Sequence, residues 1–527
     1  MRLSPLKHLL IFSAFTLSLN AAVPAPADTS AAVPAAAEGP AKEAMDAFKA
    51  GRHAKAVELA KPLADQGNAE ALYLMGFASE SGQGVEASKD RALEYYRKAA
   101  ALKHKDSIYR LSFILLASDK EEERDQAREA LETAAKDDPT VAARILGEAY
   151  LRGRLSPVAD PDKAVFWWKH AAAAGDIPSL LLVARFYEGQ FGFPELKDLK
   201  GALANYEKAA ALGDSGAMAA LGSRLLSGDE KNRDEKKGRE WLKKAIEAKE
   251  YSAYLVLGDY EENVKKNLKA ALAEYERGKD AGQMDCILRT ADFYIEGKGV
   301  EKDSTRGMAL LQKAAEAGNP IANFRLAVQP LSGDKPDLLV AYGHLLKAAS
   351  GNLAEAQNEL GLLYLSGKLA AADSAAGVAW LTRAAQGGFA QAQNNLATLY
   401  ERGAAGLSQN IENAGQLYSA AANQGHGPAT LALARLLNEG IGTKPNPEKA
   451  WALATLASER GVEDGKKLAS DIASKFNEKQ RAAAQKELDD IKSGKKADTP
   501  AKDAKAPPTK PAANASGVKP AAPAKAK

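Results

Sequence analysis

A short motif recurs along the chain at nearly constant intervals and constrains the fold more than any other feature. It consists of Leu followed by a small residue, often with Tyr three residues on and Gly three beyond that, as in LGEAYLRG (146–153) and LGLLYLSG (360–367). The small residue occupies positions 76, 112, 147, 184, 222, 258, 291, 327, 361, 397 and 434, at spacings of 33 to 38 residues. Repeats of this period with two helical stretches each predict an α/α solenoid, because one repeat cannot bury its own apolar face.

A second landmark predicts another helix in each repeat. Two small residues stand seven apart, close to two helical turns, so they share one stripe of the helix and let a neighbouring helix approach closely. These pairs are Ala92/Ala99, Ala164/Ala171, Ala202/Ala209, Gly307/Ala314, Gly377/Ala384 and Ala450/Ala457. The Gly after each first helix supplies the left-handed conformation that ends it. We therefore predict an all-α, right-handed α/α solenoid of about eleven helix-pair repeats, preceded by a half-repeat that carries Ala56.

These repeats resemble a known family. LGEAYLRG…DPDKAVFWWKHAAAAGD (146–176) and ADFYIEGKGVEKDSTRGMALLQKAAEAGN (291–319) are similar to the Sel-one-like repeat, a relative of the tetratricopeptide repeat, and the resemblance covers roughly residues 42–462. The shared marks include a Gly-x-Gly loop, found at Gly82/Gly84, Gly297/Gly299 and Gly440/Gly442. Three repeats depart from the pattern: the second lacks the loop glycines, the sixth has DYEENV (259–264), and the eighth has Pro330 at the Tyr position.

Both ends of the chain differ from the repeats in composition. Arg2 and Lys7 precede an apolar run at 9–19 that is too short to span a bilayer, and small residues follow it. Residues 1–22 are therefore typical of a cleaved secretory signal. We therefore expect an exported protein, periplasmic or else secreted, that does not span the membrane. The Ala/Pro-rich segments 23–41 and 493–527 hold too little apolar surface to fold, so we expect both to be disordered. Residues 463–492 are helical in pattern and heavily charged, which is typical of a terminal cap.

The distribution of charge argues against nucleic acid as a partner. The chain has 71 Lys and Arg against 68 Asp and Glu, and the excess lies in residues 493–527, which hold eight Lys and two Asp. A nearly neutral body lacks the electrostatic footprint of a nucleic-acid-binding protein. The basic tail is either a solubilising linker or an element that makes weak contact with an anionic envelope polymer.

Residues that could perform catalysis are sparse. The six His show no local metal-ligand spacing, and His104, His170 and His426 are expected near the ends of second helices, where the helix dipole favours a cation. Cys286 occupies a position that holds Ala in other repeats, which predicts a buried thiol, and one Cys excludes an internal disulfide. We therefore predict no catalytic residue, no metal, no cofactor and no enzyme activity.

Candidate binding residues follow from the family resemblance, which implies that first helices face a concave side and contact a ligand there. The outward positions of the first two repeats are aromatic: Tyr73, Phe77, Tyr109 and Phe113. If exposed, these rings would form one binding surface; the alternative is that they pack against the N-terminal half-repeat as core. In that case the better candidate is a neutral surface of Asn358, Asn394 and Thr398.

The resemblance and the lack of catalytic residues together predict a non-enzymatic, exported scaffold. It would bind protein segments on its concave face and organise a bacterial envelope complex. One alternative is a cell-wall or surface-polymer binding protein that uses the basic tail. Another is a hydrolase-like enzyme of the cysteine-rich repeat type, but those relatives depend on paired Cys in every repeat, which this chain lacks.

Overall fold

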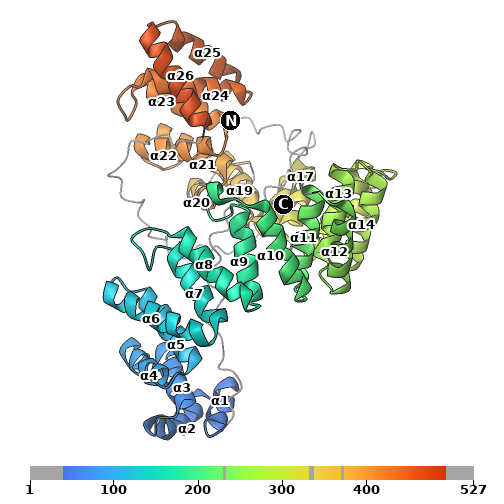
Figure 1. Cartoon of the computed structure of the whole chain (residues 1–527). Helices are drawn as coiled ribbons and strands as arrows, with labels where there is room; N and C mark the ends of the chain where they lie inside the picture. The colour runs from blue at the N-terminus through green and yellow to red at the C-terminus, as the bar shows by residue number, and fades with distance from the viewer. Residues whose placement is uncertain (1–38, 229–232, 332–336, 369–372, 494–527) are drawn as a thin grey trace, which may run out of the picture. The chain divides into compact units, whose positions relative to one another are not determined.

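A computed structural model describes residues 39–228, 233–331, 337–368 and 373–493, and within these ranges every regular element is a helix (Figure 1). This confirms the predicted all-α class and its helix-pair repeats. The chain divides into two compact units, Met1–Gly307 (unit 1) and Met308–Lys527 (unit 2), and the division falls inside one helix. The predicted signal peptide, most of the linker and the tail from residue 494 onward lie outside the described residues. Among the described helices, none has the length and apolar character needed to cross a bilayer.

The helices of unit 1 are α1 Lys42–Lys49, α2 His53–Asp65, α3 Ala69–Ser81, α4 Lys89–Ala101, α5 Lys105–Leu116, α6 Glu121–Asp137, α7 Pro139–Leu151, α8 Pro161–Ala173, α9 Ile177–Tyr187, α10 Leu199–Ala211, α11 Ser215–Ser227, α12 Glu235–Glu247, α13 Ser252–Asn263, α14 Leu268–Asp280 and α15 Met284–Glu296. Helix α16, Ser304–Glu316, contains the division between the units. Unit 2 continues with α17 Pro320–Leu331, α18 Leu338–Ser350, α19 Ala354–Ser366, α20 Ser374–Gln386, α21 Ala390–Arg402, α22 Ile411–Asn423, α23 Gly427–Glu439, α24 Pro447–Glu459, α25 Glu463–Ala473 and α26 Glu478–Lys492.

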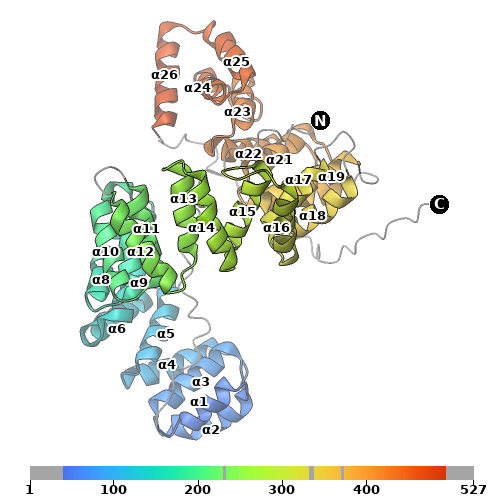
Figure 2. The ribbon, with the colours of Figure 1, turned by 90° about the vertical axis from the view of Figure 1, so that its right-hand side faces the viewer.

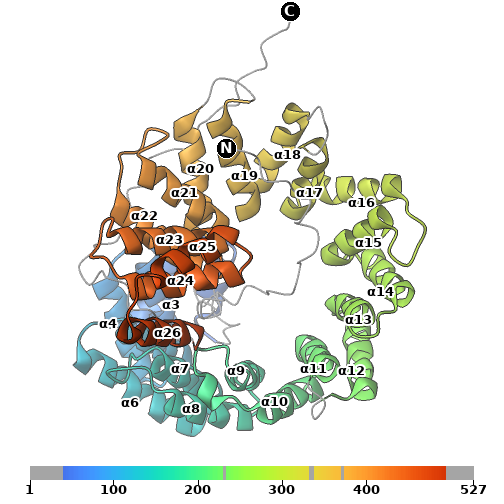
Figure 3. The same cartoon turned by 90° about the horizontal axis from the view of Figure 1, so that it is seen from above.

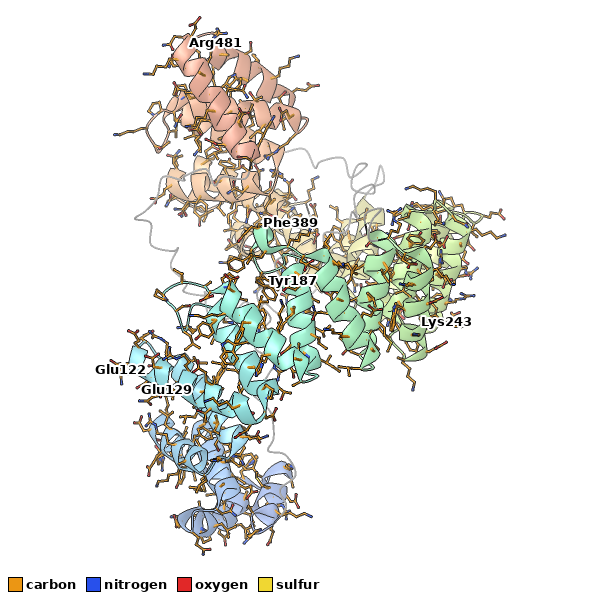
Figure 4. The ribbon with its side chains drawn as sticks, in the orientation of Figure 1. Glu122, Glu129, Tyr187, Lys243, Phe389 and Arg481 are labelled. Carbon is orange, nitrogen blue, oxygen red and sulfur yellow. The ribbon has the colours of Figure 1, made fainter. Side chains whose placement is uncertain are left out.

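Helices alternate between two rows within each unit. The first helix of a repeat packs against the second helix of the same repeat, as α7 does against α8 and α21 against α22. In unit 1 the odd-numbered helices α7 to α15 lie on the inner side of a curved row and the even-numbered α8 to α14 on its outer side, and in unit 2 α17, α19 and α21 lie inside α18, α20 and α22 (Figure 3). We call these the inner and outer rows. Exposed charged residues include Glu122 and Glu129 on α6 and Lys243 on the outer-row helix α12 (Figure 4).

Local sequence determines where the helices start and stop. Asp160 precedes Pro161 at the start of α8, and its carboxylate accepts a hydrogen bond from the backbone N–H of Lys163 at 3.0 Å. Helices α3, α15 and α23 end at glycines with positive φ: Gly82 at 72°, Gly297 at 76° and Gly440 at 68°. The prediction that glycine ends first helices in the left-handed conformation is confirmed at these positions.

The small residue of the Leu-small pair lies against a large side chain of the second helix. A Cβ on Gly76 would lie 2.7 Å from the ring of Tyr96, and a Cβ on Gly147 would lie 2.9 Å from the carbonyl oxygen of Ala164 and closer still to the Trp168 ring. Both rings are completely buried. Glycine therefore allows the ring to lie directly on the backbone of the first helix, which gives the pair its close packing.

The second glycine of the Gly-x-Gly loop ties each repeat to the one before it. A Cβ on Gly84 would lie 2.5 Å from the carbonyl oxygen of His53, the first residue of α2. Equivalent contacts join Gly299 to Leu268 at the start of α14 and Gly442 to Ile411 at the start of α22. The loop that follows a first helix is thus packed on the preceding repeat's second helix.

The region predicted as a helical cap consists of two helices, α25 and α26. Both pack on α24, which lies between them in Figure 2. The residues buried at this junction include Ile472, Phe476, Ala484 and Leu488. Lys492 at the end of α26 forms an ion pair with Glu459 at the end of α24, with 2.8 Å between Nζ and Oε1. The apolar face of α24 is therefore covered by residues that lack the repeat motif.

Candidate partner-binding groove

The four aromatic residues of the first two repeats do not form the single exposed surface that was one of the two alternatives left open by the sequence. Tyr73 is only 5% exposed, and its ring lies 5.9 Å from the Tyr96 ring and 5.1 Å from the His104 ring, between centroids. Burial raises the pKa of Tyr73 to about 12. Tyr73 belongs to the core because the following helices α4 and α5 bring Tyr96 and His104 over it.

The other three rings differ from one another in environment. Phe77 is partly buried and makes an edge-to-face contact with Phe48 of α1, with 5.7 Å between centroids. Tyr109 is also partly buried. Its burial, and to a lesser extent the negative charge of Asp138, raise the pKa of Tyr109 to about 12. Phe113 alone of the four is exposed, at 43%. The alternative weighed from the sequence, packing against the N-terminal half-repeat, holds for Phe77.

The second group of candidates also divides. Asn358 on α19 is buried, and its side-chain carbonyl accepts a hydrogen bond from the Asn395 amide at 2.9 Å. It therefore links neighbouring first helices rather than facing a ligand. Asn394 and Thr398, both on α21, line a cavity.

This cavity has a volume of about 490 Å³ and lies in unit 2, between α21 of the inner row and the later helices α23 and α25. Its apolar walls are formed by Pro428, Leu431, Ala432, Val462 and Leu468. Its polar and charged lining consists of Asn394, Thr398, Tyr418, Glu401, Arg402, Arg435 and Asp464. We call this cavity the groove. An apolar centre with a few polar groups around it is typical of a binding site.

A hydrogen-bond network fixes one wall of the groove. The Tyr418 hydroxyl, from the outer helix α22, donates to Glu401 Oε2 at 2.6 Å, and Arg435 Nη2 donates to Glu401 Oε1 at 3.3 Å. Thr398 Oγ1 lies 3.0 Å from the same hydroxyl. Burial and the hydrogen bond to Glu401 raise the pKa of Tyr418 to about 12, so this hydroxyl stays protonated at neutral pH.

Three side chains on the groove remain available to a ligand. Within the part of the chain that the structure describes, Arg402 and Asp464 are exposed and have no ion-pair or hydrogen-bond partner for their charged groups. The side-chain amide of Asn394 likewise has no partner among the described residues. Sequence reasoning named Asn394 but missed both charges, since Asp464 belongs to the cap and Arg402 is the last residue of its helix.

The Tyr–Glu contact at the groove recurs elsewhere, and sequence reasoning missed it. A Tyr of the second helix donates its hydroxyl proton to a Glu four residues after the small residue of the first helix, in the pairs Tyr96/Glu80, Tyr206/Glu188, Tyr275/Glu262 and Tyr418/Glu401. Repeats with Leu or Trp at the Tyr position carry Leu or Ile at the Glu position, as in Trp168/Leu151, Leu242/Leu226, Leu311/Ile295 and Leu381/Leu365. This correlation inside one sequence was the signal that could have revealed the contact.

The histidines and the cysteine have structural environments. The sequence predicted His104 and His426 near the ends of second helices, where a cation is favoured. Instead, they cap the starts of α5 and α23, where each Nδ1 accepts a hydrogen bond from a backbone N–H. Burial lowers the pKa of both rings, which favours the neutral form that this contact requires. Cys286 is buried, as predicted, and burial raises its pKa to about 12. No group of three or more His, Cys, Asp and Glu side chains suited to a metal ion occurs among the described residues.

A family model described as Sel1 repeat matches most of the chain. The matched segments are residues 69–104, 140–176, 177–214, 215–249, 285–319, 320–353, 354–389, 390–426 and 427–462. The chain belongs to the Sel1 repeat family. The stretches between matches, 105–139 and 250–284, are the second and sixth repeats, which lack the loop glycines, whereas the eighth repeat is matched despite Pro330. The groove lies in the last two matched Sel1 repeats and the cap that follows them.

Two curated fungal proteins are similar to parts of this Sel1 repeat protein. Chitin synthase regulator SKT5 of Saccharomyces cerevisiae is 28% identical over 251 residues, which are 44% of this chain and 35% of the relative. Chitin synthase regulatory factor 3 of Schizosaccharomyces pombe is 32% identical over 101 residues, which are 18% of this chain and 11% of the relative. The chain thus spans about a third of the first relative and about a tenth of the second.

Solved structures of bacterial repeat proteins are also similar to the chain. A protective antigen of uropathogenic Escherichia coli that displays an SLR fold is 24% identical, with a TM-score of 0.44, over 82% of this chain and 93% of that one. A Sel1 repeat protein from Oxalobacter formigenes is 26% identical, with a TM-score of 0.39, over 45% of this chain and 98% of that one.

Proposed function

We propose that this Sel1 repeat protein is an exported, non-enzymatic scaffold that binds protein segments on its inner row and organises a complex of the bacterial envelope. The groove between α21, α23 and α25 is the observation that carries the proposal. It offers apolar walls together with polar and charged side chains that lack partners within the described chain, a combination that favours recognition of another polypeptide.

Export is supported by the sequence of residues 1–22, with its basic start, short apolar run and small residues behind it. N-terminal sequencing of the mature protein should find a start between Val23 and Asp28, in the periplasmic or secreted fraction. A protein that begins at Met1 in the cytoplasmic fraction would contradict export without affecting the binding proposal.

A regulatory rather than catalytic role is supported by two observations. Both fungal relatives are described as regulators of an enzyme, so the similarity concerns proteins that act on others. Cys286, the residue on which a cysteine-dependent hydrolase would rely, is buried with a raised pKa, whereas a cysteine nucleophile needs an exposed thiol with a lowered pKa.

Site-specific photo-cross-linking in cells tests the binding proposal. A photoreactive amino acid replaces Pro428, which is exposed on the groove at the start of α23, and in the control variant it replaces Pro447, which is at the start of α24 and does not line the groove. We expect light-dependent adducts with a reproducible protein partner from position 428 and none from position 447. Equal labelling at both positions, or none at 428, would contradict binding at the groove.

A further inference from the structure

We infer that the groove recognises an extended segment of about five residues, with an acidic side chain at one end, an apolar side chain in the middle and a basic side chain at the other end. This inference rests on the proposed function, because it specifies the chemistry of the partner segment. It follows from the direction of three helices, the positions of two charges and the chemistry of the surface between them.

The three helices that form the groove run in the same direction. At the start of α23, the N-cap His426 lies 3.0 Å from Gln391 at the start of α21, between Nε2 and Oε1. Further along, Arg435 of α23 contacts Glu401 near the end of α21. Arg460, just before α25, donates a hydrogen bond to Thr430 in the first turn of α23 at 2.6 Å. The starts of all three helices therefore lie at one end of the groove.

Two charges that have no partner among the described residues lie toward opposite ends of the groove. Asp464 is the second residue of α25, and Arg402 is the last of the thirteen residues of α21. Counted from the helix starts, the two positions differ by eleven residues, which corresponds to about 16 Å along the helix axis at about 1.5 Å per residue. An extended chain advances about 3.3 Å per residue. Its first and fifth residues stand about 13 Å apart, and the lengths of the Arg402 and Asp464 side chains, which both line the cavity, cover the remaining distance.

The surface between the charges selects the middle of the segment. Leu431, Ala432 and Leu468 line the groove and are only partly buried, so an apolar side chain placed there would remove apolar area from water on both partners. The side-chain amide of Asn394, which no described residue contacts by a hydrogen bond, has a donor and an acceptor that match the backbone C=O and N–H of an extended peptide. A helical ligand offers neither group, since its backbone is already paired. These features favour an extended ligand.

Fluorescence polarisation of the full chain with four labelled peptides tests this inference. The probe GSDALAKSG carries both charges and a central Leu; GSDALADSG and GSKALAKSG replace one charge each; GSDAGAKSG removes the apolar side chain. Two charges of opposite sign and one apolar contact each contribute to affinity, so we expect GSDALAKSG to bind at least five-fold more tightly than the others. The binding should weaken as salt is raised, because both ion pairs are exposed to solvent.

Charge reversal provides the sharper measurement. Arg402→Glu should shift preference from GSDALAKSG to GSKALAKSG, and Asp464→Lys should shift it to GSDALADSG, each by at least five-fold. Both residues are exposed, so the variants should fold, and their melting temperatures check this. Matched controls are Arg185→Glu and Asp106→Lys, at exposed positions on the first helices α9 and α5 of two repeats in unit 1; these should leave the preference unchanged.

Several outcomes would overturn the inference. They are equal binding of the four peptides, a preference that does not follow the charge reversals, or a response at only one of the two positions. The tail contains DTPAK at 498–502, which has the same order of charges around a Pro. A synthetic peptide of residues 494–527 that displaces GSDALAKSG at a lower concentration than unlabelled GSDALAKSG itself would assign the groove to the tail instead.

Failure of this inference is distinguishable from failure of the proposed function. A partner cross-linked at position 428 by a segment without this pattern would leave the proposed function standing and overturn the five-residue motif. Peptide preferences that follow the charge reversals, with no partner captured in cells, would support the motif and contradict the function.

Discussion

The first two repeats and the last two repeats place different side chains at equivalent positions of their inner helices. Tyr73, Phe77, Tyr109 and Phe113 in the first two correspond to Asn394, Thr398, Leu431 and Arg435 in the last two. Both regions share the same framework, in which a second-helix Tyr and an Arg from the next first helix bind one Glu: Tyr96, Arg110 and Glu80 in one, Tyr418, Arg435 and Glu401 in the other. We call them the aromatic region and the groove region.

The comparison shows that the size of a few side chains separates core from cavity in this fold. In the aromatic region, the Tyr73 ring fills the space against Tyr96 and His104 and is buried. In the groove region, the equivalent Asn394 is too short to do so, and a cavity of about 490 Å³ lies beside it. The framework alone therefore does not determine whether a pair of repeats can bind a ligand.

The largest expected effect compares Tyr73→Ala with Asn394→Ala. Loss of a buried aromatic ring should lower the free energy of unfolding by about 3–5 kcal/mol. Loss of the partly buried amide, which has no partner among the described residues, should change it by less than about 0.5 kcal/mol. Urea unfolding followed by circular dichroism measures both. Similar losses for the two variants would break the comparison.

The shared Glu should matter more in the aromatic region. Glu80 accepts the Tyr96 hydroxyl at 2.8 Å and two Arg110 hydrogen bonds at 2.8 and 2.7 Å. Glu80→Leu removes all three and should cost about 2–3 kcal/mol, against about 1–2 kcal/mol for Glu401→Leu, whose partner Arg435 is exposed.

Repeats that carry Leu at both positions supply the control for that experiment. The double variants Glu80→Leu/Tyr96→Leu and Glu80→Leu/Tyr96→Phe both leave no buried hydroxyl without an acceptor. If Leu fills the space as it does in Leu242/Leu226, the variant with Leu at position 96 should be the more stable of the two. Chemical denaturation of the single and double variants gives the coupling free energy. A coupling near zero would show that the Tyr and the Glu act independently.

The two regions should respond alike to acid. His104 and His426 each cap a first helix through an unprotonated Nδ1, and burial lowers the pKa of both. The unfolded chain then binds more protons than the folded one below the ordinary His pKa of about 6.5, so the stability that each cap contributes is present above that pH and is lost as pH falls toward the lowered pKa.

Replacing either cap by Asn, the residue that caps α3 at Asn68, should reduce this acid sensitivity. Free energies of unfolding at pH 5 and pH 7.5 measure it for the wild type, His104→Asn and His426→Asn. A wild-type chain that loses no more stability in acid than both variants would contradict the neutral-cap assignment.

The smallest effect concerns the turn before each of these caps. Lys103 has a φ of 61° in the aromatic region, whereas the equivalent position in the groove region is Gly425 with a φ of 87°. Because a Cβ is strained in this conformation, Lys103→Gly should stabilise the chain by about 0.5–1 kcal/mol and Gly425→Lys should destabilise it by a similar amount. Melting temperatures of the two variants test the expected opposite signs.

The elements that could be predicted from the sequence depend on residues inside one repeat. The Leu-small pair, the small residues seven apart and the glycine at position 82 act within one helix pair, so their spacing was sufficient. The burial of Tyr73 could not be predicted, because helical periodicity gives the side that a residue faces but not the distance to His104 of the next repeat. Phe77 is covered by Phe48 of α1, which lies outside the repeat pattern.

The candidate site was only partly accessible for the same reason. Asn394 and Thr398 could be placed on an inward-facing helix from their position in the repeat. Asp464 and Leu468 could not, since the cap has no repeat motif to give their orientation. Asn358 occupies the same position in its repeat as Asn394 does in the next one. Unlike Asn394, it is buried and accepts a hydrogen bond from Asn395, a contact that crosses between repeats.

Each buried Tyr–Glu pair lies within a single repeat: Glu80 and Tyr96 in the matched segment 69–104, Glu188 and Tyr206 in 177–214, Glu401 and Tyr418 in 390–426, and Glu262 and Tyr275 in the sixth repeat at 250–284. A gene duplication or deletion of one whole repeat therefore copies or removes the buried acceptor together with its donor. Such an event leaves no hydroxyl stranded in the interior, and it changes only the more exposed Arg contributed by the following repeat. The chain can thus lengthen or shorten during evolution in whole repeats, each carrying its own polar core, while new side chains are sampled on the inner row.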